Sequence, residues 1–364
     1  MTVRKIGTYT AATVALGMLP ALAQAQSAGP EWDFYGHLNL GILTVDDGVE
    51  SNSSLTDNDN SNSRIGLLMT QQLQGDAVFA FNFETALGLT GSASLNGADN
   101  SLDARYSRTE LRKLEVTYET PTLGKFSFGQ GSMSADGASE ADFSSTGVAA
   151  YVGINDIAAS QTLRFSDGTL SNVVTGGTNT TFDGSRRFRV RYDTPTFNGF
   201  SGSVSAGKEV LAKGVDTEYY DLGARYNQDY GDYSVDARAA YSFRSSIDDL
   251  LVGSMAVIHN PTGLNVAIAG GRQIDSDASY GYIKAGLSRE YTSYGATSFS
   301  IDYYNGDDFF VTGSDTSSVG VAVVQRLDDY DTELYATYRT YDFDSAPASY
   351  KDLDVTFVGA RWSF

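Results

Sequence analysis

The sequence contains no cysteine and only two histidines among its 364 residues. Without cysteine there is no disulfide framework, no thiolate catalysis and no cysteine-ligated zinc. His37 and His259 alone leave little material for a histidine metal site or a proton shuttle. No G-x-S-x-G, Walker or H-E-x-x-H motif is present. The sequence therefore predicts neither an enzyme nor a metal centre, and no cofactor is expected.

Basic residues are also scarce, since 25 Lys and Arg stand against 45 Asp and Glu and give a formal net charge of −20. Binding to nucleic acid needs basic groups that neutralise phosphates, so the composition argues against a nucleic acid partner. Beyond the N-terminus, no apolar run reaches the ~18 to 20 residues that a membrane helix requires. A membrane-spanning helix is therefore not expected in the rest of the chain.

The first 25 residues have the pattern of an export signal. Two basic residues precede an apolar run over 11–22, and Ala23-Gln24-Ala25 has the small-x-small pattern that signal peptidase cleaves. The run is too short and wrongly flanked for a stable membrane anchor. We expect residues 1–25 to be a cleaved signal peptide, which leaves 26–364 as one exported domain with a net charge of −22 instead of −20.

Apolar and polar side chains alternate along most of the exported chain, which is typical of β-strands with two different faces. Arg187, Arg189 and Arg191, for example, alternate with apolar or aromatic neighbours. Most of the alternating runs have close to the ~9 to 11 residues with which a tilted strand crosses a bilayer. Sixteen strands are expected, at residues 31–45, 62–73, 77–90, 105–119, 125–130, 186–194, 200–208, 219–228, 233–244, 250–259, 264–273, 280–291, 296–305, 317–327, 332–343 and 352–364.

The connections between these strands alternate in length. Tight turns such as 74–76 and 231–232 alternate with long polar loops such as 46–61 and 91–104, as in an up-and-down transmembrane barrel. The polar face carries too many charges to line a dry core, so the apolar face is expected to meet lipid. Strands in lipid must close into a barrel. The predicted fold is an all-β, antiparallel transmembrane β-barrel of 16 strands, and a secreted all-β adhesin is the alternative.

Three segments of the chain resemble the Gram-negative general porin family. They are Ser63-Arg64-Ile65-Gly66-Leu67, the stretch 191–204 around a tight turn, and the C-terminal Gly359-Ala360-Arg361-Trp362-Ser363-Phe364. The resemblance spans essentially all of the exported chain. It implies a homotrimer of sixteen-stranded barrels in the bacterial outer membrane, in contact with lipid and lipopolysaccharide. It also implies that the last strand, with Trp362 and Phe364, is the signal read by the barrel-insertion machinery.

A 55-residue segment from Gly131 to Ser185 lacks the alternation. A segment this long without regular structure inside a compact domain is usually functional. In the porin family the corresponding third loop folds into the lumen and narrows it, so the resemblance implies that 131–185 is the constriction loop. The first half of this segment contains three acidic side chains, Asp136, Glu140 and Asp142.

Basic side chains are expected on the wall that faces this loop. Arg187, Arg189 and Arg191 share the polar face of one strand, and Arg64 lies on the polar face of another. An acidic loop opposite a basic wall would set up a transverse field that orients dipolar solutes and disfavours apolar ones. Local pairing of ordinary surface charges is the alternative interpretation. The alternation places Arg112 on the outer face, so a pore-lining role is not expected for it.

The net charge of −22 favours cations, because acidic groups around a mouth and lumen attract them. The function expected from the resemblance is an outer-membrane porin for passive diffusion of small hydrophilic solutes and ions, with a preference for cations. A solute-selective porin of the same fold would instead show saturable binding, and a barrel that acts as a surface adhesin would have a plugged lumen.

Acidic residues are also frequent in the loops that are expected to lie outside the membrane. Asp46, Asp47, Glu50, Asp57 and Asp59 belong to one such loop region. These carboxylates could bridge divalent cations to anionic lipid headgroups, although keeping the loops solvated is the simpler role.

Overall fold

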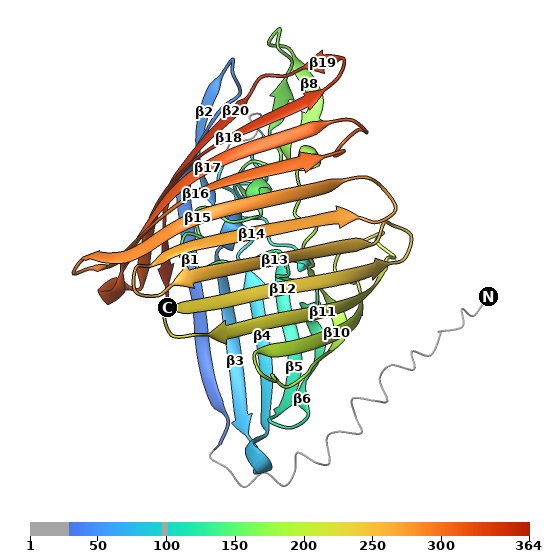
Figure 1. The fold of residues 1–364 in the computed structure, drawn as a ribbon, viewed down its shortest axis with the longest axis vertical. Coiled ribbons are helices and arrows are strands. Elements are labelled where there is room, and N and C mark those ends of the chain that lie inside the picture. The colour runs from blue at the N-terminus through green and yellow to red at the C-terminus, as the bar shows by residue number, and fades with distance from the viewer. Residues whose placement is uncertain (1–28, 97–100) are drawn as a thin grey trace, which may run out of the picture.

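The computed structural model describes residues 29–96 and 101–364, so the predicted signal peptide lies outside the described residues. The described chain is wound into one closed antiparallel barrel (Figure 1). Strand β1 (Glu31–Asp46) closes the ring by pairing with the last strand, β20 (Leu353–Ser363). In the described ranges no helix has the length and apolar character needed to span a membrane.

The predicted barrel of sixteen strands is confirmed. The fourteen barrel strands between β1 and β20 are β3 (Arg64–Gln72), β4 (Val78–Ala86), β5 (Leu111–Thr120), β6 (Gly124–Ser132), β9 (Arg186–Asp193), β10 (Phe200–Lys208), β11 (Glu218–Asp229), β12 (Tyr233–Arg244), β13 (Leu250–His259), β14 (Leu264–Gln273), β15 (Ser279–Thr292), β16 (Gly295–Asp307), β17 (Asp315–Leu327) and β18 (Thr332–Ser345).

Two short strands that the sequence did not predict extend this sheet at its long-loop end. Strand β2 (Ser51–Asp57) pairs with the second half of β1, and β19 (Ala348–Ser349) pairs with the end of β18. The prediction that 46–61 is a loop is therefore wrong over the residues of β2. The sequence of this strand is too polar to show the alternation of apolar and polar residues. The predicted strand 105–119 begins only at Leu111, because residues Arg108–Glu110 form a 3-10 turn (η3).

The outer face of the barrel is apolar, as the alternation predicts. In the middle of β16 the side chains of Phe299, Ile301 and Tyr303 are exposed, with Ile301 at 54%. The alternate residues Ser300 and Asp302 point inward and are buried. An apolar outer face suits hydrocarbon, since lipid-facing residues of a barrel strand alternate with lumen-facing ones.

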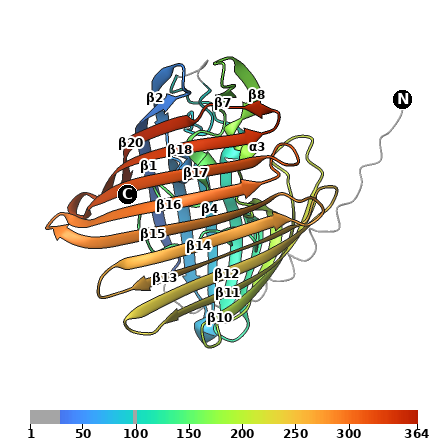
Figure 2. The same ribbon diagram turned by 45° about the horizontal axis from the view of Figure 1, so that its top comes forward.

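The segment between β6 and β9 begins at Met133, because β6 continues to Ser132. The predicted start at Gly131 is therefore two residues too early. The segment is also more regular than expected, and its four elements are η4 (Ile154–Ile157), β7 (Thr162–Arg164), β8 (Leu170–Val174) and α3 (Thr175–Thr178). The β7–β8 hairpin lies at the same end of the barrel as β2, as Figures 1 and 2 both show.

One part of the barrel interior is a dry core. Apolar residues of the 133–185 segment, such as Ile157, Leu163 and Val173, are buried in one cluster with inward-facing side chains of the wall. The wall residues include the aromatic side chains Tyr304 and Phe357, which are 0% exposed. The expectation that the polar face carries too many charges to line a dry core is wrong for this part of the barrel, because aromatic side chains on that face pack against the segment.

A lysine in the middle of the outer face should destabilise the barrel. We expect I301K to lower the free energy of unfolding in lipid by about 2–4 kcal/mol, the cost of Lys at the bilayer midplane of a barrel. S201K, which places the same group on the inner face of β10, should have little effect. Urea titration of the protein in lipid vesicles measures both values, and equal destabilisation by the two variants would contradict the outward orientation of Ile301.

Candidate functional site

The 133–185 segment is tied to the inner face of the wall by hydrogen bonds along much of its length. Its partners are inward-facing side chains of β11, β13 and β16, spread over neighbouring parts of the barrel. The pairs are Ala135 N with Asp221 Oδ2 at 3.2 Å, Ala141 N with Ser254 Oγ at 3.0 Å, Thr146 Oγ1 with Ser300 Oγ at 2.8 Å, and Tyr304 Oη with Thr180 O at 2.7 Å. The segment therefore has a defined position against the wall.

A buried lysine forms the strongest of these attachments. Lys284 of β15 is 1% exposed, and its Nζ lies 2.8 Å from Asp142 Oδ2 and 2.7 Å from the carbonyl oxygen of Ala150. The ammonium group thus joins two points of the segment to one point of the wall. Asp142, which the sequence analysis assigned to the pore lining, has its charge neutralised by this lysine. Sequence reasoning did not single out Lys284, because its partner lies 142 residues away.

Three carboxylates of the segment, Asp136, Glu140 and Asp183, lie close together. Asp183 accepts hydrogen bonds from Gly137 N at 2.7 Å and from Ser139 N at 2.8 Å, so it ties the end of the segment to its beginning. Glu140 is exposed on the segment, but the surrounding protein partly desolvates its carboxylate and raises its pKa to about 7, and the negative charges of Asp183 and Asp136 add to the shift. Within the described residues, neither Asp136 nor Glu140 has a basic partner within 4 Å.

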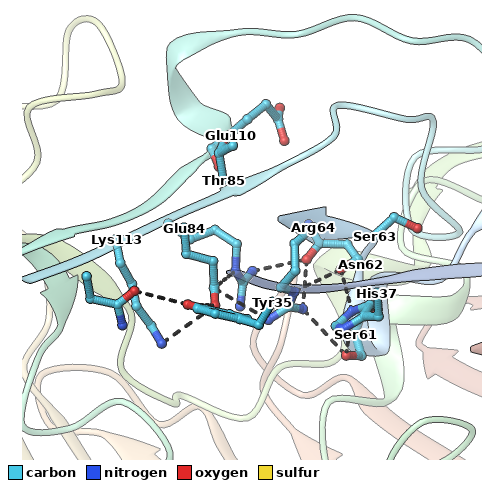
Figure 3. Close-up of polar contacts among 12 residues, drawn as sticks. Tyr35, His37, Ser61, Asn62, Ser63, Arg64, Glu84, Thr85, Glu110 and Lys113 are labelled. Carbon is cyan, nitrogen blue, oxygen red and sulfur yellow. Dashed lines mark hydrogen bonds and ion pairs between the residues drawn. The ribbon is translucent and has the colours of Figure 1, made fainter. Parts of the chain in front are cut away.

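A basic cluster on the wall surrounds a single carboxylate, Glu84 of β4 (Figure 3). Arg112 Nε donates to Glu84 Oε1 at 2.6 Å, and the charged groups of Arg64 and Lys113 each lie 3.7 Å from the same carboxylate. Tyr35 also donates a hydrogen bond to Glu84, at 3.0 Å. Three positive charges therefore share one negative charge, and the cluster keeps an excess of positive charge.

Arg112 belongs to this cluster because of a β-bulge. In the pairing of β4 with β5, Glu84 lies opposite Lys113 but the next residue, Thr85, lies opposite Leu111. Arg112 is the extra residue, and a bulge of this kind re-aims side chains. The sequence prediction that Arg112 lies on the outer face is therefore wrong, since strict alternation does not hold across the bulge.

Arg187, Arg189 and Arg191 of β9 lie on the side of the strand opposite exposed Phe188 and Val190, and each has its own acidic neighbour. Their ion pairs are Arg187 with Glu209 at 3.4 Å, Arg189 with Glu115 at 2.5 Å and Arg191 with Asp193 at 2.7 Å. Arg191 also donates to the carbonyl oxygen of Met133, at 2.6 Å, so it helps to hold the start of the segment. Much of the positive charge of β9 is thus balanced locally.

The acidic residues expected in an external loop have protein partners. Asp47 pairs with Arg164 at 2.7 Å, Asp57 accepts from Ser63 Oγ at 2.7 Å, and Asp59 accepts from Ala93 N at 2.8 Å. Across residues 29–96 and 101–364, no three Asp, Glu or His side chains are grouped so that they could hold a metal ion.

The two C-terminal aromatic residues lie on the outer face where the barrel closes. Trp362 and Phe364 are 49% and 42% exposed, and their rings lie 5.2 Å apart. Gly36 N of β1 donates to the carbonyl oxygen of Phe364 at 3.0 Å, so pairing continues to the last residue.

A family model described as Gram-negative porin matches residues 11–346. This chain belongs to the Gram-negative porin family. Among curated proteins, no sequence matches it. Membership of this family makes the chain an outer-membrane channel of a Gram-negative bacterium and not an enzyme.

Several solved structures share this fold at low sequence identity. An anion-selective porin from Comamonas acidovorans has a TM-score of 0.59 at 16% identity, and the match covers 92% of this chain and 100% of that one. OprB from Pseudomonas putida also has a TM-score of 0.59, at 9% identity with 97% of both chains covered. The trimer form of OmpT from Vibrio cholerae has a TM-score of 0.55 at 15% identity, with 93% and 100% covered.

Removing the buried lysine should loosen the segment. We expect K284M to leave Asp142 without its cation and to destabilise the protein by about 3–5 kcal/mol, as when one partner of a buried ion pair is lost. Single-channel recordings should then show larger current fluctuations than in the wild type. K208M removes an exposed lysine whose ion-pair partner, Asp216, is also exposed, and it serves as the control. Unchanged noise and stability in K284M would contradict the anchoring role.

Proposed function

We propose that the 133–185 segment narrows the lumen and that solutes cross between its acidic residues and the basic cluster around Glu84. The two groups of charge are close, since Asp136 interacts electrostatically with Arg112. They nevertheless form no direct ion pair in the described residues. Unpaired charges of opposite sign across an open passage produce a transverse field, which favours polar solutes over apolar ones.

Open space on both sides of the basic cluster supports this route. A cavity of about 620 Å³ is bordered by Lys113, Glu115 and Arg191. A second cavity of about 280 Å³ is bordered by Arg112 and Arg187. The Glu84 cluster lies between the two, because Arg112 and Lys113 are neighbours on β5 and both contact Glu84. We therefore infer passive diffusion of small hydrophilic solutes and ions past this cluster.

A preference for cations completes the proposal. Its support is the net charge of −20 for the whole chain and the unpaired acids Asp136 and Glu140 beside the passage. The fold itself does not determine whether cations or anions are preferred, since a porin of the same fold from Comamonas acidovorans is anion-selective. The charges along the lumen and mouth of each porin decide this property.

We further propose that three copies associate, as in the trimer form of OmpT from Vibrio cholerae. The lipid-facing surface would then contact outer-membrane lipid and lipopolysaccharide over the rest of its circumference. Trp362 and Phe364, exposed at the closing strand, would be recognised by the insertion machinery. The cleaved signal peptide at 1–25 belongs to the same proposal.

Channel recordings test the proposed function directly. Purified protein in a planar bilayer with a KCl gradient should give ohmic single-channel currents and a reversal potential of the sign that indicates K⁺ preference. E140Q and D136N should each reduce that preference, because each removes a negative charge beside the passage. S317A, on the outer face of β17, should leave it unchanged. Clear anion preference in the wild type would refute the proposed selectivity.

The preference should also depend on pH near neutrality. The pKa of Glu140 is raised to about 7, so lowering the pH from 8 to 6 protonates this carboxylate and removes its charge. We expect the reversal potential to move toward zero over this interval, whereas an ordinary glutamate, with a pKa of ~4.3, would respond only at lower pH. E140Q should lack most of this step, and the remainder would come from neighbouring Asp183, because burial raises the pKa of that carboxylate to about 6. A wild-type reversal potential that is constant from pH 8 to 6 would contradict the assignment.

A further inference from the structure

The cavity of about 280 Å³ beside the basic cluster has an unusual border. Three arginines, Arg112, Arg186 and Arg187, line it together with the carboxylates Glu110 and Glu209. Glu209 is held by the backbone N–H groups of its own loop and pairs with Arg187 at 3.4 Å. Arg112 is already paired with Glu84. Among the described residues, the charges at this cavity that remain without an ion-pair partner within 4 Å are those of Arg186 and Glu110.

Arg186 is the first residue of β9, and its side chain has no acidic neighbour within 4 Å among the described residues. It donates no side-chain hydrogen bond to them either. Its positive charge instead acts on Arg64 and Arg112, which carry the same sign. Glu84 can balance only one of these like charges, so they repel each other, and an anion between them would relieve that repulsion.

One further donor at the same cavity also lacks an acceptor. Arg187 uses Nη1 for Ser185 Oγ and for the carbonyl oxygen of Arg186, while its Nε is buried without a partner. Arg112 donates through Nε and Nη1, to Glu84 and to Asn62. Buried polar groups normally have partners, so an unpaired Nε at the edge of a cavity points to a group that enters it.

We propose that this cavity is a binding subsite for small organic acids, in which Arg186 and its arginine neighbours hold a carboxylate of the solute. The inference rests on the proposed function, because the solute must enter the lumen to reach the cavity. Planar guanidinium groups match carboxylates in shape and form charge-assisted hydrogen bonds with them. The cavity is smaller than the ~300 to 1,000 Å³ of pockets for drug-sized ligands, which suits an acid of a few carbon atoms.

The subsite gives the channel a property that free diffusion lacks. A carboxylate that pauses at Arg186 occupies part of the passage, so it reduces the ionic current while it is bound. The reduction saturates when the subsite is filled. The subsite is local, so the proposed preference for K⁺ over Cl⁻ in simple salt is compatible with it.

Titration of channel currents with succinate tests the subsite. In wild-type channels in KCl, succinate added on the long-loop side should reduce the current with a saturating dependence, whereas neutral succinamide should not. R186Q should weaken the apparent affinity for succinate by about tenfold or more. R186K keeps the positive charge but loses the planar guanidinium group, so its affinity should be intermediate. R272Q is the matched control, because Arg272 is an exposed arginine on the outer side of β14.

These recordings distinguish a failure of the subsite from a failure of the proposed diffusion channel. Channels that conduct KCl but show no saturable response to succinate would overturn the subsite and leave the diffusion channel in place. Equal weakening by R186Q and R272Q would also overturn it, since the effect would then reflect overall charge. A response to inorganic phosphate without one to succinate would overturn the assignment to organic acids. R186Q channels that insert into the bilayer and conduct KCl show that the variant has folded, whatever their conductance.

Discussion

Hydrocarbon offers no hydrogen-bond partner, so every backbone N–H and C=O group within the bilayer must be paired inside the protein. The ring of strands meets this requirement where β1 pairs with β20 from His37–Ser363 to Asp46–Asp354. Closure forces each strand to present one face outward and one inward, and the side chains follow with a period of two. The apolar outer face and the charged inner face are both consequences of this closure.

Within the ring, the interior is divided between two kinds of surface. On one side, the 133–185 segment packs an apolar core against aromatic residues such as Tyr304 and Phe357, and Lys284 fixes it through Asp142. On the other side, charged residues of β5 and β9 border open cavities. The segment packs apolar side chains against the barrel wall on one side and presents carboxylates to the passage on the other. Because of this packing, the carboxylates keep fixed positions relative to the wall. Fixed charges polarise a passage more effectively than mobile ones, because they need no reorganisation when a solute arrives.

The sequence was sufficient to predict the strands, because lipid on one side imposes alternation on every strand that crosses it. The alternation of apolar and polar residues does not determine every feature of the barrel, and the predictions for Arg112, β2 and Asp142 each show a different reason. A single extra residue at the bulge reverses the facing of Arg112, and no local signal marks that residue. Strand β2 is polar on both faces, so it shows no period. The position of Asp142 depends on Lys284, a residue far away in the chain whose side chain could be placed only by the closed ring.

The central claim is that this ring encloses a wet, charged passage beside a dry, packed region. Because the chain has no native cysteine, single-cysteine variants labelled with a membrane-impermeant thiol reagent test it directly. Cysteines at Ser201 and Ser203, which border open space inside β10, should be labelled in intact membranes. Cysteines at Ala322 and Val324, buried on the inner face of β17, and at Val321 on its outer face should resist labelling. Labelling of all five positions alike, or of Val321 alone, would contradict the account.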